Sequence, residues 1–137
     1  MKGLVIDAST AIGFVLKDEH APHALKALEV IESGVPTFVP AHWCVEVANG
    51  LIMAERRKRA SQADITEALN LVVALPVVMD DQTAQRSCSD TAALARQYDL
   101  TIYDAAYLEL AMRRGATLAT TDRRLAESAQ ATGVVVL

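Results

Sequence analysis

Short apolar runs alternate with longer stretches of helical periodicity along the whole chain. The short runs are bounded by Gly, Pro, Asp or Thr, as buried parallel strands tend to be. They predict about five strands, over residues 3–6, 35–39, 76–79, 116–120 and 134–137. The longer stretches predict helices over residues 10–16, 22–32, 41–59, 62–74, 83–98, 103–113 and 123–131. This alternation favours an α/β fold with a mainly parallel sheet.

Polar and glycine residues at the ends of these stretches support the predicted helices. Gly34 and Gly115 each follow a helical stretch and suit C-terminal caps, and Ser61 with Asp64 has the spacing of a capping box. No internal repeat, low-complexity tract or Pro/Gly/Ser-rich linker interrupts the pattern. We therefore expect one domain spanning residues 1–137, which at this length buries roughly two thirds of its unfolded surface.

Cysteine content and hydropathy limit the class of protein. Cys44 and Cys88 are the only cysteines, and each lies in a predicted helix, so we expect two reduced, buried thiols and no disulfide. The apolar run before Asp7 is too short for the core of a signal peptide, and no apolar stretch reaches transmembrane length. These features predict a soluble, cytoplasmic protein without a membrane partner.

The overall charge gives conflicting indications about a nucleic-acid partner. A net charge of -4 and a pI of about 5.3 argue against one, because phosphate-binding proteins normally present a basic surface. However, if acidic residues gather in one cation-binding pocket, the surface around it can still be basic. Basic residues available for such a rim are Arg56, Arg57, Lys58, Arg59, Arg113, Arg114, Arg123 and Arg124. The first four also fit the last turn of a helix, where positive charge favours the helix dipole.

Two aspartates stand at the ends of predicted strands, where ligands bind in parallel sheets that are covered by helices. Asp7 directly follows the first predicted strand, and Asp122 comes just after the fourth. Each of them also precedes a predicted helix, and an aspartate in that position is more often an N-terminal cap than a metal ligand. Taken singly, neither residue establishes a functional site.

Two further acids lie in helical stretches. Asp104 stands three residues after Thr101, which is the spacing of a capping box, so a structural role explains it. Glu46 has aliphatic, aromatic or small neighbours in sequence, and His42 and Asn49 share its helix face. This polar strip on an otherwise apolar helix indicates that Glu46 faces either solvent or a polar cavity.

Convergent carboxylates would suit the hydrolysis of phosphodiester bonds. That reaction needs a water that is nucleophilic at neutral pH and positive charge on the scissile phosphate, and divalent cations held by carboxylates supply both. Carboxylates within reach of one another repel, so without a cation we expect such a site to be strained and partly protonated.

Each of the four acids lies in a distinctive motif. The motifs are Leu-Val-Ile-Asp-Ala-Ser around Asp7, Trp-Cys-Val-Glu-Val-Ala-Asn around Glu46, Tyr-Asp-Ala-Ala-Tyr-Leu-Glu-Leu-Ala around Asp104 and Leu-Ala-Thr-Thr-Asp-Arg-Arg-Leu around Asp122. In this order the chain resembles the PIN-domain nucleases, and most closely the VapC toxins of bacterial toxin–antitoxin pairs. The resemblance covers essentially the whole chain at the family's length.

The resemblance implies a fold and a metal site. The fold is a three-layer α/β/α sandwich of the PIN type. The metal, Mg²⁺ or Mn²⁺, is bound by an acidic quartet: Asp7, Glu46, Asp104 and Asp122. Within the quartet, Asp7 and Asp104 are the closest ligands. Polar residues that match positions lining such sites are Ser9, Asn49 and Thr120.

The resemblance also implies an activity and partners. The activity is that of an endoribonuclease that leaves a 5′-phosphate and a 3′-hydroxyl and so inhibits translation or growth. The partners are the RNA substrate, a cognate antitoxin protein of the VapB type and a second copy of the chain in a homodimer.

Three alternatives remain open from the residues alone. A phosphotransfer receiver domain has a similar acidic pocket, but it needs a lysine after a late strand, where this chain has Arg123 and Arg124. A haloacid-dehalogenase-like phosphatase needs a carboxylate two residues after Asp7, where Ser9 stands. The alternative that is not an enzyme is a catalytically inactive PIN-like module that binds RNA or protein.

Other distinctive residues fit structural roles. Either Asp80 or Asp81 is expected to cap the helix that begins near Thr83. His20 and His23 lack the further His or Cys ligands of a zinc site. Aromatic residues that have helical spacing beside aliphatics are expected in the core, although they could stack on bases: Trp43, Tyr103 and Tyr107. Apolar residues of the early helices fit either the core or an interface: Phe14, Leu25, Leu28 and Ile31.

Overall fold

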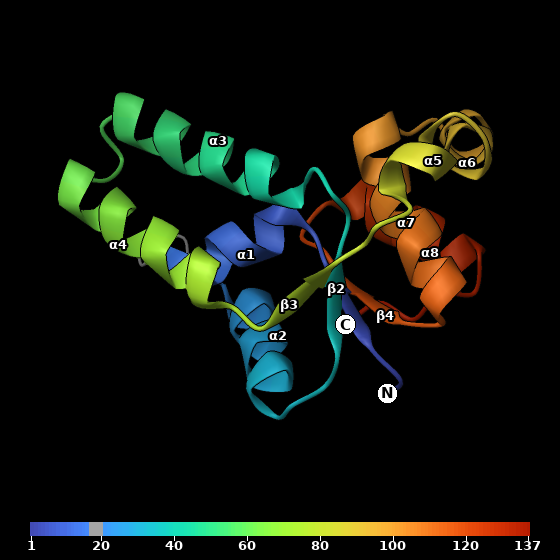
Figure 1. Cartoon of the computed structure of the whole chain (residues 1–137), viewed down its shortest axis with the longest axis horizontal. Coiled ribbons are helices and arrows are strands. Elements are labelled where there is room, and N and C mark those ends of the chain that lie inside the picture. The colour runs from blue at the N-terminus through green and yellow to red at the C-terminus, as the bar shows by residue number, and fades with distance from the viewer. Residues whose placement is uncertain (17–20) are drawn as a thin grey trace.

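Helices cover both faces of a parallel β-sheet in the computed structural model, which describes residues 1–16 and 21–137. The sheet has the order β3-β2-β1-β4, with β1 (Leu4–Ile6), β2 (Thr37–Val39), β3 (Val77–Met79) and β4 (Thr117–Ala119). On one side lie α1 (Ala8–Val15), α2 (Pro22–Glu32), α3 (Trp43–Arg56) and α4 (Gln62–Ala74). On the other lie α5 (Thr83–Ser87), α6 (Asp90–Tyr98), α7 (Ile102–Arg114) and α8 (Arg123–Ala131) (Figure 1). The predicted three-layer α/β/α sandwich is confirmed.

The core is most completely buried along β1 and β4. Strands β1 and β4 are buried along their whole length, as expected for parallel strands covered on both faces. Helix α7 packs across β1, β2 and β4, and it is buried from Ala105 to Ala111, so its position relative to the sheet is fixed. Of the early apolar residues, Phe14 and Ile31 belong to the core, Leu28 packs against it and Leu25 is exposed.

Helix termini follow the local sequence signals. Asp7 and Asp122 are N-caps, accepting hydrogen bonds from the amides of Thr10 and Leu125. Ser61 and Asp64 form the predicted capping box. Gly115 ends α7 in the left-handed conformation, with φ of 59°, which glycine adopts without strain. Among the described helices, none combines the length and hydropathy of a membrane span.

The prediction of a fifth strand is wrong. Residues 134–137 meet β4 through a single parallel bridge between Leu118 and Val136, so the sheet of the described residues has four strands. Leu118 donates its amide to the carbonyl of Val135 at 2.9 Å and accepts from Leu137 at 2.9 Å. Gly133, in the left-handed conformation with φ of 83°, turns the chain after α8, and of the residues that follow only Val136 pairs with β4.

The predicted helix over residues 83–98 is broken into two. α5 ends at Ser87 and α6 begins at Asp90, with Ser89 outside helical geometry. Serine hydroxyls compete for the backbone here, since Ser87 donates to the carbonyl of Thr83 at 2.6 Å and Ser89 to that of Arg86 at 3.3 Å.

The prediction of buried cysteines is also wrong, since Cys44 and Cys88 are both free and exposed. On α3 the buried positions are Trp43, Val47, Leu51 and Ala54. Cys44 is the second residue of α3, at its N-terminal end, and Cys88 lies at the break between α5 and α6.

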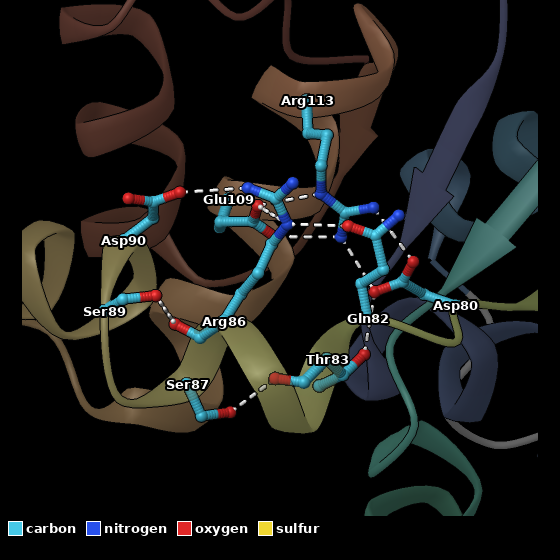
Figure 2. A network of polar contacts seen from close by, with 9 residues as sticks. All are labelled: Asp80, Gln82, Thr83, Arg86, Ser87, Ser89, Asp90, Glu109 and Arg113. Atoms are coloured by element: carbon cyan, nitrogen blue, oxygen red, sulfur yellow. Dashed lines mark hydrogen bonds and ion pairs between the residues drawn. The ribbon is translucent and has the colours of Figure 1, made fainter.

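A network of ion pairs joins the end of β3 to α5, α6 and α7 (Figure 2). Arg113 donates Nη1 and Nη2 to the two carboxylate oxygens of Asp80, at 3.0 and 2.8 Å, and Nε to Glu109 at 2.8 Å. Arg86 lies 3.5 Å from Glu109 and 2.9 Å from Asp90. These contacts attach α5 and α6 to the face of α7 that carries Glu109 and Arg113.

Asp80 therefore does not cap α5, contrary to expectation, and neither does Asp81. The N-cap is Gln82, whose side chain makes no capping hydrogen bond. Asp80 accepts instead from the Thr83 hydroxyl at 3.0 Å, and its side chain is only 1% exposed. Burial raises the pKa of Asp80, but hydrogen bonds from Arg113 and Thr83 outweigh burial and hold that pKa below 3.8.

Replacing Arg113 is expected to destabilise the fold, because it leaves the buried Asp80 carboxylate without a counter-charge and Glu109 with Arg86 alone. Arg113→Met should lower the free energy of unfolding by about 3 kcal/mol at neutral pH, measured by urea denaturation. Because folding lowers the pKa of Asp80, its stabilising contribution is present above 3.8 and is lost as the pH falls through its folded value. The difference between wild type and variant should therefore shrink in acid.

A matched control is Arg123→Met, which removes an arginine that is 92% exposed and paired with Glu127. Its effect should stay within about 0.5 kcal/mol. Equal losses of stability in the two variants would contradict a structural role for the buried network.

Candidate active site

The pairing of β1 with β4 places Asp7 at the centre of the site. Ile6 and Ala119 are partners in the register of the two strands, so the residues that follow them lie side by side. The Asp7 amide donates to the carbonyl of Ala119 at 3.2 Å. The Asp7 side chain is buried and also caps α1 through the amide of Thr10 at 2.9 Å. Its capping role and its position at the strand end thus occur together.

Two hydroxyl groups donate hydrogen bonds to the Asp7 carboxylate, and a third supports one of them. Ser9 donates to Oδ1 at 2.7 Å, and Thr120 donates a short hydrogen bond to Oδ2. Ser9 in turn accepts from the hydroxyl of Thr121 at 2.7 Å. The sequence singled out Ser9 and Thr120 but missed Thr121, although its place between Thr120 and Asp122 was a usable signal.

Asp122 reaches the same place through Thr120. Its amide donates to the Thr120 hydroxyl at 3.0 Å, while its carboxylate caps α8 through the amide of Leu125 at 2.9 Å. The residue is exposed. Asp122 is therefore tied by its backbone to the hydroxyl that holds Asp7, and its charge lies at the open side of the site.

Glu46 lies on α3, in the helical layer opposite to α8, and α3 packs closely against α1. A Cβ at Gly50 would lie 2.4 Å from Cδ1 of Ile12, so the absence of a side chain at Gly50 allows this approach. One carboxylate oxygen of Glu46, Oε1, accepts from the hydroxyl of Tyr107 at 2.8 Å and lies 3.0 Å from Nε2 of His42. Both contacts leave Oε2 for other partners.

These contacts determine the charge of Glu46 and Tyr107. Burial raises the pKa of the Glu46 carboxyl, but hydrogen bonds from His42 and Tyr107 outweigh it, and the pKa is lowered. Burial and the neighbouring Glu46 charge raise the pKa of the Tyr107 phenol. Glu46 is therefore ionised at neutral pH, and Tyr107 is a permanent hydrogen-bond donor to it.

Asp104 is the acid on which the other three act. It lies in the first turn of α7, where Thr101 caps the helix by accepting from the Asp104 amide at 3.1 Å. Burial raises the pKa of the Asp104 carboxyl, and the charges of Asp122, Glu46 and Asp7 raise it further. The structure thus brings all four predicted acids within electrostatic range of one another. Of the two shifts, the pKa of Asp104 moves in the direction expected of a repulsive site, whereas that of Glu46 moves in the opposite direction.

The donor set fits a hard divalent cation in an open site. Carboxylate oxygens are the ligands that Mg²⁺ and Mn²⁺ prefer, and repulsion felt at Asp104 is the kind that a cation relieves. Within residues 1–16 and 21–137, no three His, Cys, Asp or Glu side chains converge as ligands of a single ion. Mg²⁺ is commonly held by one or two carboxylates, with water and substrate phosphate completing its shell. His20 lies outside the described residues.

The basic rim is smaller than the sequence allowed. Arg113 is held in the ion-pair network and cannot contribute. Arg123 and Arg124 are exposed at the start of α8, next to Asp122. Residues 56–59 are exposed at the far end of α3 from Glu46, and Arg56 occupies its last turn, as the helix-dipole alternative predicts.

Removing the Asp104 charge is expected to stabilise the protein when metal is absent. Because folding raises the pKa of Asp104 above 3.8, its ionised form opposes folding, so the cost is absent at low pH and complete above the folded pKa. In EDTA at neutral pH, Asp104→Asn should melt at a higher temperature than wild type by scanning calorimetry. The gain should vanish below pH 3.8.

Asp81→Asn is the control for a general loss of negative charge. It removes the same charge as Asp104→Asn, but from an exposed residue. If Asp104→Asn melts no higher than Asp81→Asn at neutral pH, the described repulsion is not present.

The sequence of this chain is similar to known ribonucleases. The PIN domain family matches residues 4–130. The chain is 30% identical over 124 residues to ribonuclease VapC3 of Pyrobaculum aerophilum, which covers 90% of this chain and 92% of that protein. It is 29% identical over 125 residues to ribonuclease VapC3 of Mycobacterium tuberculosis strain H37Rv, which covers 91% of this chain and 86% of that protein.

Solved structures share the fold. The crystal structure of PAE2754 from Pyrobaculum aerophilum aligns with a TM-score of 0.71 at 21% identity and covers 98% of this chain and 83% of that one. Mycobacterium tuberculosis VapC20, a toxin that cleaves the sarcin-ricin loop, aligns with a TM-score of 0.61 at 15% identity and covers 98% of both chains. The family match over almost the whole sequence, together with the fold that the structure reveals, shows that this chain belongs to the PIN-domain family, as a ribonuclease of the VapC type.

Proposed function

We propose that this chain is an endoribonuclease that depends on Mg²⁺ or Mn²⁺ and acts as the toxin of a toxin–antitoxin pair. The observation that carries the proposal is that Asp122, Glu46 and Asp7 lie close enough to Asp104 for their charges, together with burial, to raise its pKa. RNA is supported as the substrate class by the relatives named ribonuclease VapC3. The family assignment replaces the receiver-domain and phosphatase alternatives.

In this proposal Asp7 and Asp104 are the closest metal ligands. A bound divalent cation supplies an activated water and positive charge on the scissile phosphate. Asp7 is held rigidly, and Thr120 is the donor to Oδ2, so that oxygen retains acceptor capacity for a cation. Asp104 gains most from a nearby positive charge, because burial and three neighbouring acids oppose its ionisation.

The remaining residues orient and extend the site. Tyr107 and His42 hold Oε1 of Glu46, so that Oε2 can accept a proton from, or hydrogen-bond to, the attacking water. Asp122 adds negative charge at the open side of the site. Asn49 is exposed on α3, one turn beyond Glu46, in a position to contact the RNA backbone. The products are a 5′-phosphate and a 3′-hydroxyl.

The proposed partners are a VapB-type antitoxin and a second copy of the chain. The structure leaves single apolar side chains exposed on α4 and β3, which a partner could cover: Leu71, Val73, Val78 and Met79. We expect a purified dimer, as the family resemblance implies, which light scattering of the free protein would detect.

Removing the charge of either proposed ligand should abolish cleavage without unfolding the protein. Asp7→Asn and Asp104→Asn should each lower kcat/KM for RNA by about 100-fold or more in Mg²⁺, since asparagine keeps the shape and, at position 7, the helix cap. The measurement is the initial rate on total cellular RNA, and EDTA should stop the wild-type reaction. Asp81→Asn, which changes an exposed acid next to β3, should keep the wild-type rate.

Near-native rates in both Asp7→Asn and Asp104→Asn would refute the assigned chemistry. Failure of the wild type to cut any RNA, despite binding Mg²⁺ by calorimetry, would favour the inactive RNA- or protein-binding module. Sequencing the 5′ ends of the fragments would identify the RNA that is cut.

A further inference from the structure

An exposed aromatic ring stands beside the acidic site. Tyr103 immediately precedes Asp104 in the first turn of α7 and is 61% exposed, whereas Tyr107, one turn further on, is 1% exposed. The sequence-based expectation that both belong to the core is therefore confirmed for Tyr107 and wrong for Tyr103. At the N-terminal end of α7 the helix extends beyond the protein core, and the Tyr103 ring lies on that part.

The ring is nevertheless held in position by His42. The Tyr103 and His42 ring centroids are 5.6 Å apart with an edge-on geometry, and His42 makes a similar contact to Tyr107 at 5.2 Å. Nε2 of His42 also lies 3.2 Å from the backbone carbonyl of Tyr103. An exposed tyrosine that is supported in this way loses little conformational freedom when it binds a ligand.

The same histidine connects the Tyr103 ring to the acidic site. Nε2 of His42 is 3.0 Å from the Glu46 carboxylate, so a single imidazole separates the Tyr103 ring from Glu46. His42 thus contacts both the exposed ring and one of the four acids. An RNA that has its scissile phosphate at the acids can therefore place a neighbouring base at the Tyr103 ring.

We propose that Tyr103 is a substrate-binding residue that stacks on a base of single-stranded RNA next to the scissile phosphate. The proposal rests on the ribonuclease function proposed above and adds a contact to the RNA. Aromatic stacking accepts any base, because every base has a π-face. It also attracts RNA without positive charge, which suits an acidic protein whose basic rim is small.

Base stacking is tested with a fluorescent base. Short oligoadenosine RNAs, each carrying 2-aminopurine at one position, are titrated with the protein in Ca²⁺. Stacking on Tyr103 should quench the fluorescence at one or two positions of the RNA. Tyr103→Phe and Tyr103→Trp should keep the quenching, whereas Tyr103→Leu, which keeps bulk but lacks a π-face, should lose it together with about 10-fold in affinity.

Cleavage kinetics separate binding from chemistry. Tyr103→Leu should raise KM for RNA about 10-fold with kcat nearly unchanged, because stacking acts equally in the ground and transition states. The control is Met112→Ala, which removes an exposed apolar side chain at the opposite end of α7 and should leave both constants unchanged. Melting temperatures of all variants should match the wild type.

Several outcomes overturn the proposal. The first is that wild-type protein quenches the 2-aminopurine fluorescence at no position of the RNA. The second is that Tyr103→Leu binds RNA as tightly as Tyr103→Phe. The third is that Tyr103→Leu changes the molar mass of the protein by light scattering but leaves RNA binding unchanged. The last would assign Tyr103 to a protein interface. A wild type that cuts no RNA overturns the proposed function instead, and the quenching experiment still decides the stacking.

Discussion

The chemistry of this protein depends on Asp104, whose pKa is raised by burial and by the charges of Asp122, Glu46 and Asp7. Two features of the fold force the acids together: the register of β1 and β4, which places Asp7 beside Thr120, and the close packing of α3 on α1, which delivers Glu46. Hydroxyl and amide donors hold the Asp7 carboxylate in place, and hydrogen bonds from His42 and Tyr107 lower the pKa of Glu46. The cost therefore appears at Asp104, whose pKa is raised. A cation is the species that such an arrangement attracts.

Helix α7 carries two acids in opposite electrostatic environments. Near its C-terminal end, Glu109 is buried but paired with Arg113, which also pairs with Asp80. At its N-terminal end, Asp104 faces three other acids. The buried centre of the helix, from Ala105 to Ala111, joins the two regions. The compensated network and the apolar packing thus provide the stability that allows the other end of the same helix to carry uncompensated charge.

Local signals in the sequence were sufficient for the elements whose ends are set by caps, such as Asp7, Ser61 and Gly115. They failed where tertiary contacts decide. The pairing of Asp80 with Arg113 joins residues far apart in the chain, so the sequence favoured a local cap. The fifth strand failed because its residues match β4 at one position only.

In the candidate site, too, local motifs were visible in the sequence and most tertiary contacts were not. The resemblance to a family selected the four acids, and in the fold burial and the charges of the other three acids raise the pKa of Asp104. The contacts that orient them were only partly visible in sequence. Tyr107 was expected as core and is core, yet its hydroxyl also holds Glu46 across 61 residues of chain. Tyr103 has the same helical spacing but lies beyond the packed part of α7, a distinction that periodicity does not encode.

The most direct test of the central claim is the pKa of the Asp104 carboxyl, measured by NMR titration of its side-chain carbon with and without Mg²⁺. If the four acids repel one another until a cation binds among them, the pKa lies above 3.8 in EDTA and falls when Mg²⁺ is added. A pKa of Asp104 that is raised in EDTA and unchanged by saturating Mg²⁺ would contradict metal binding at this site.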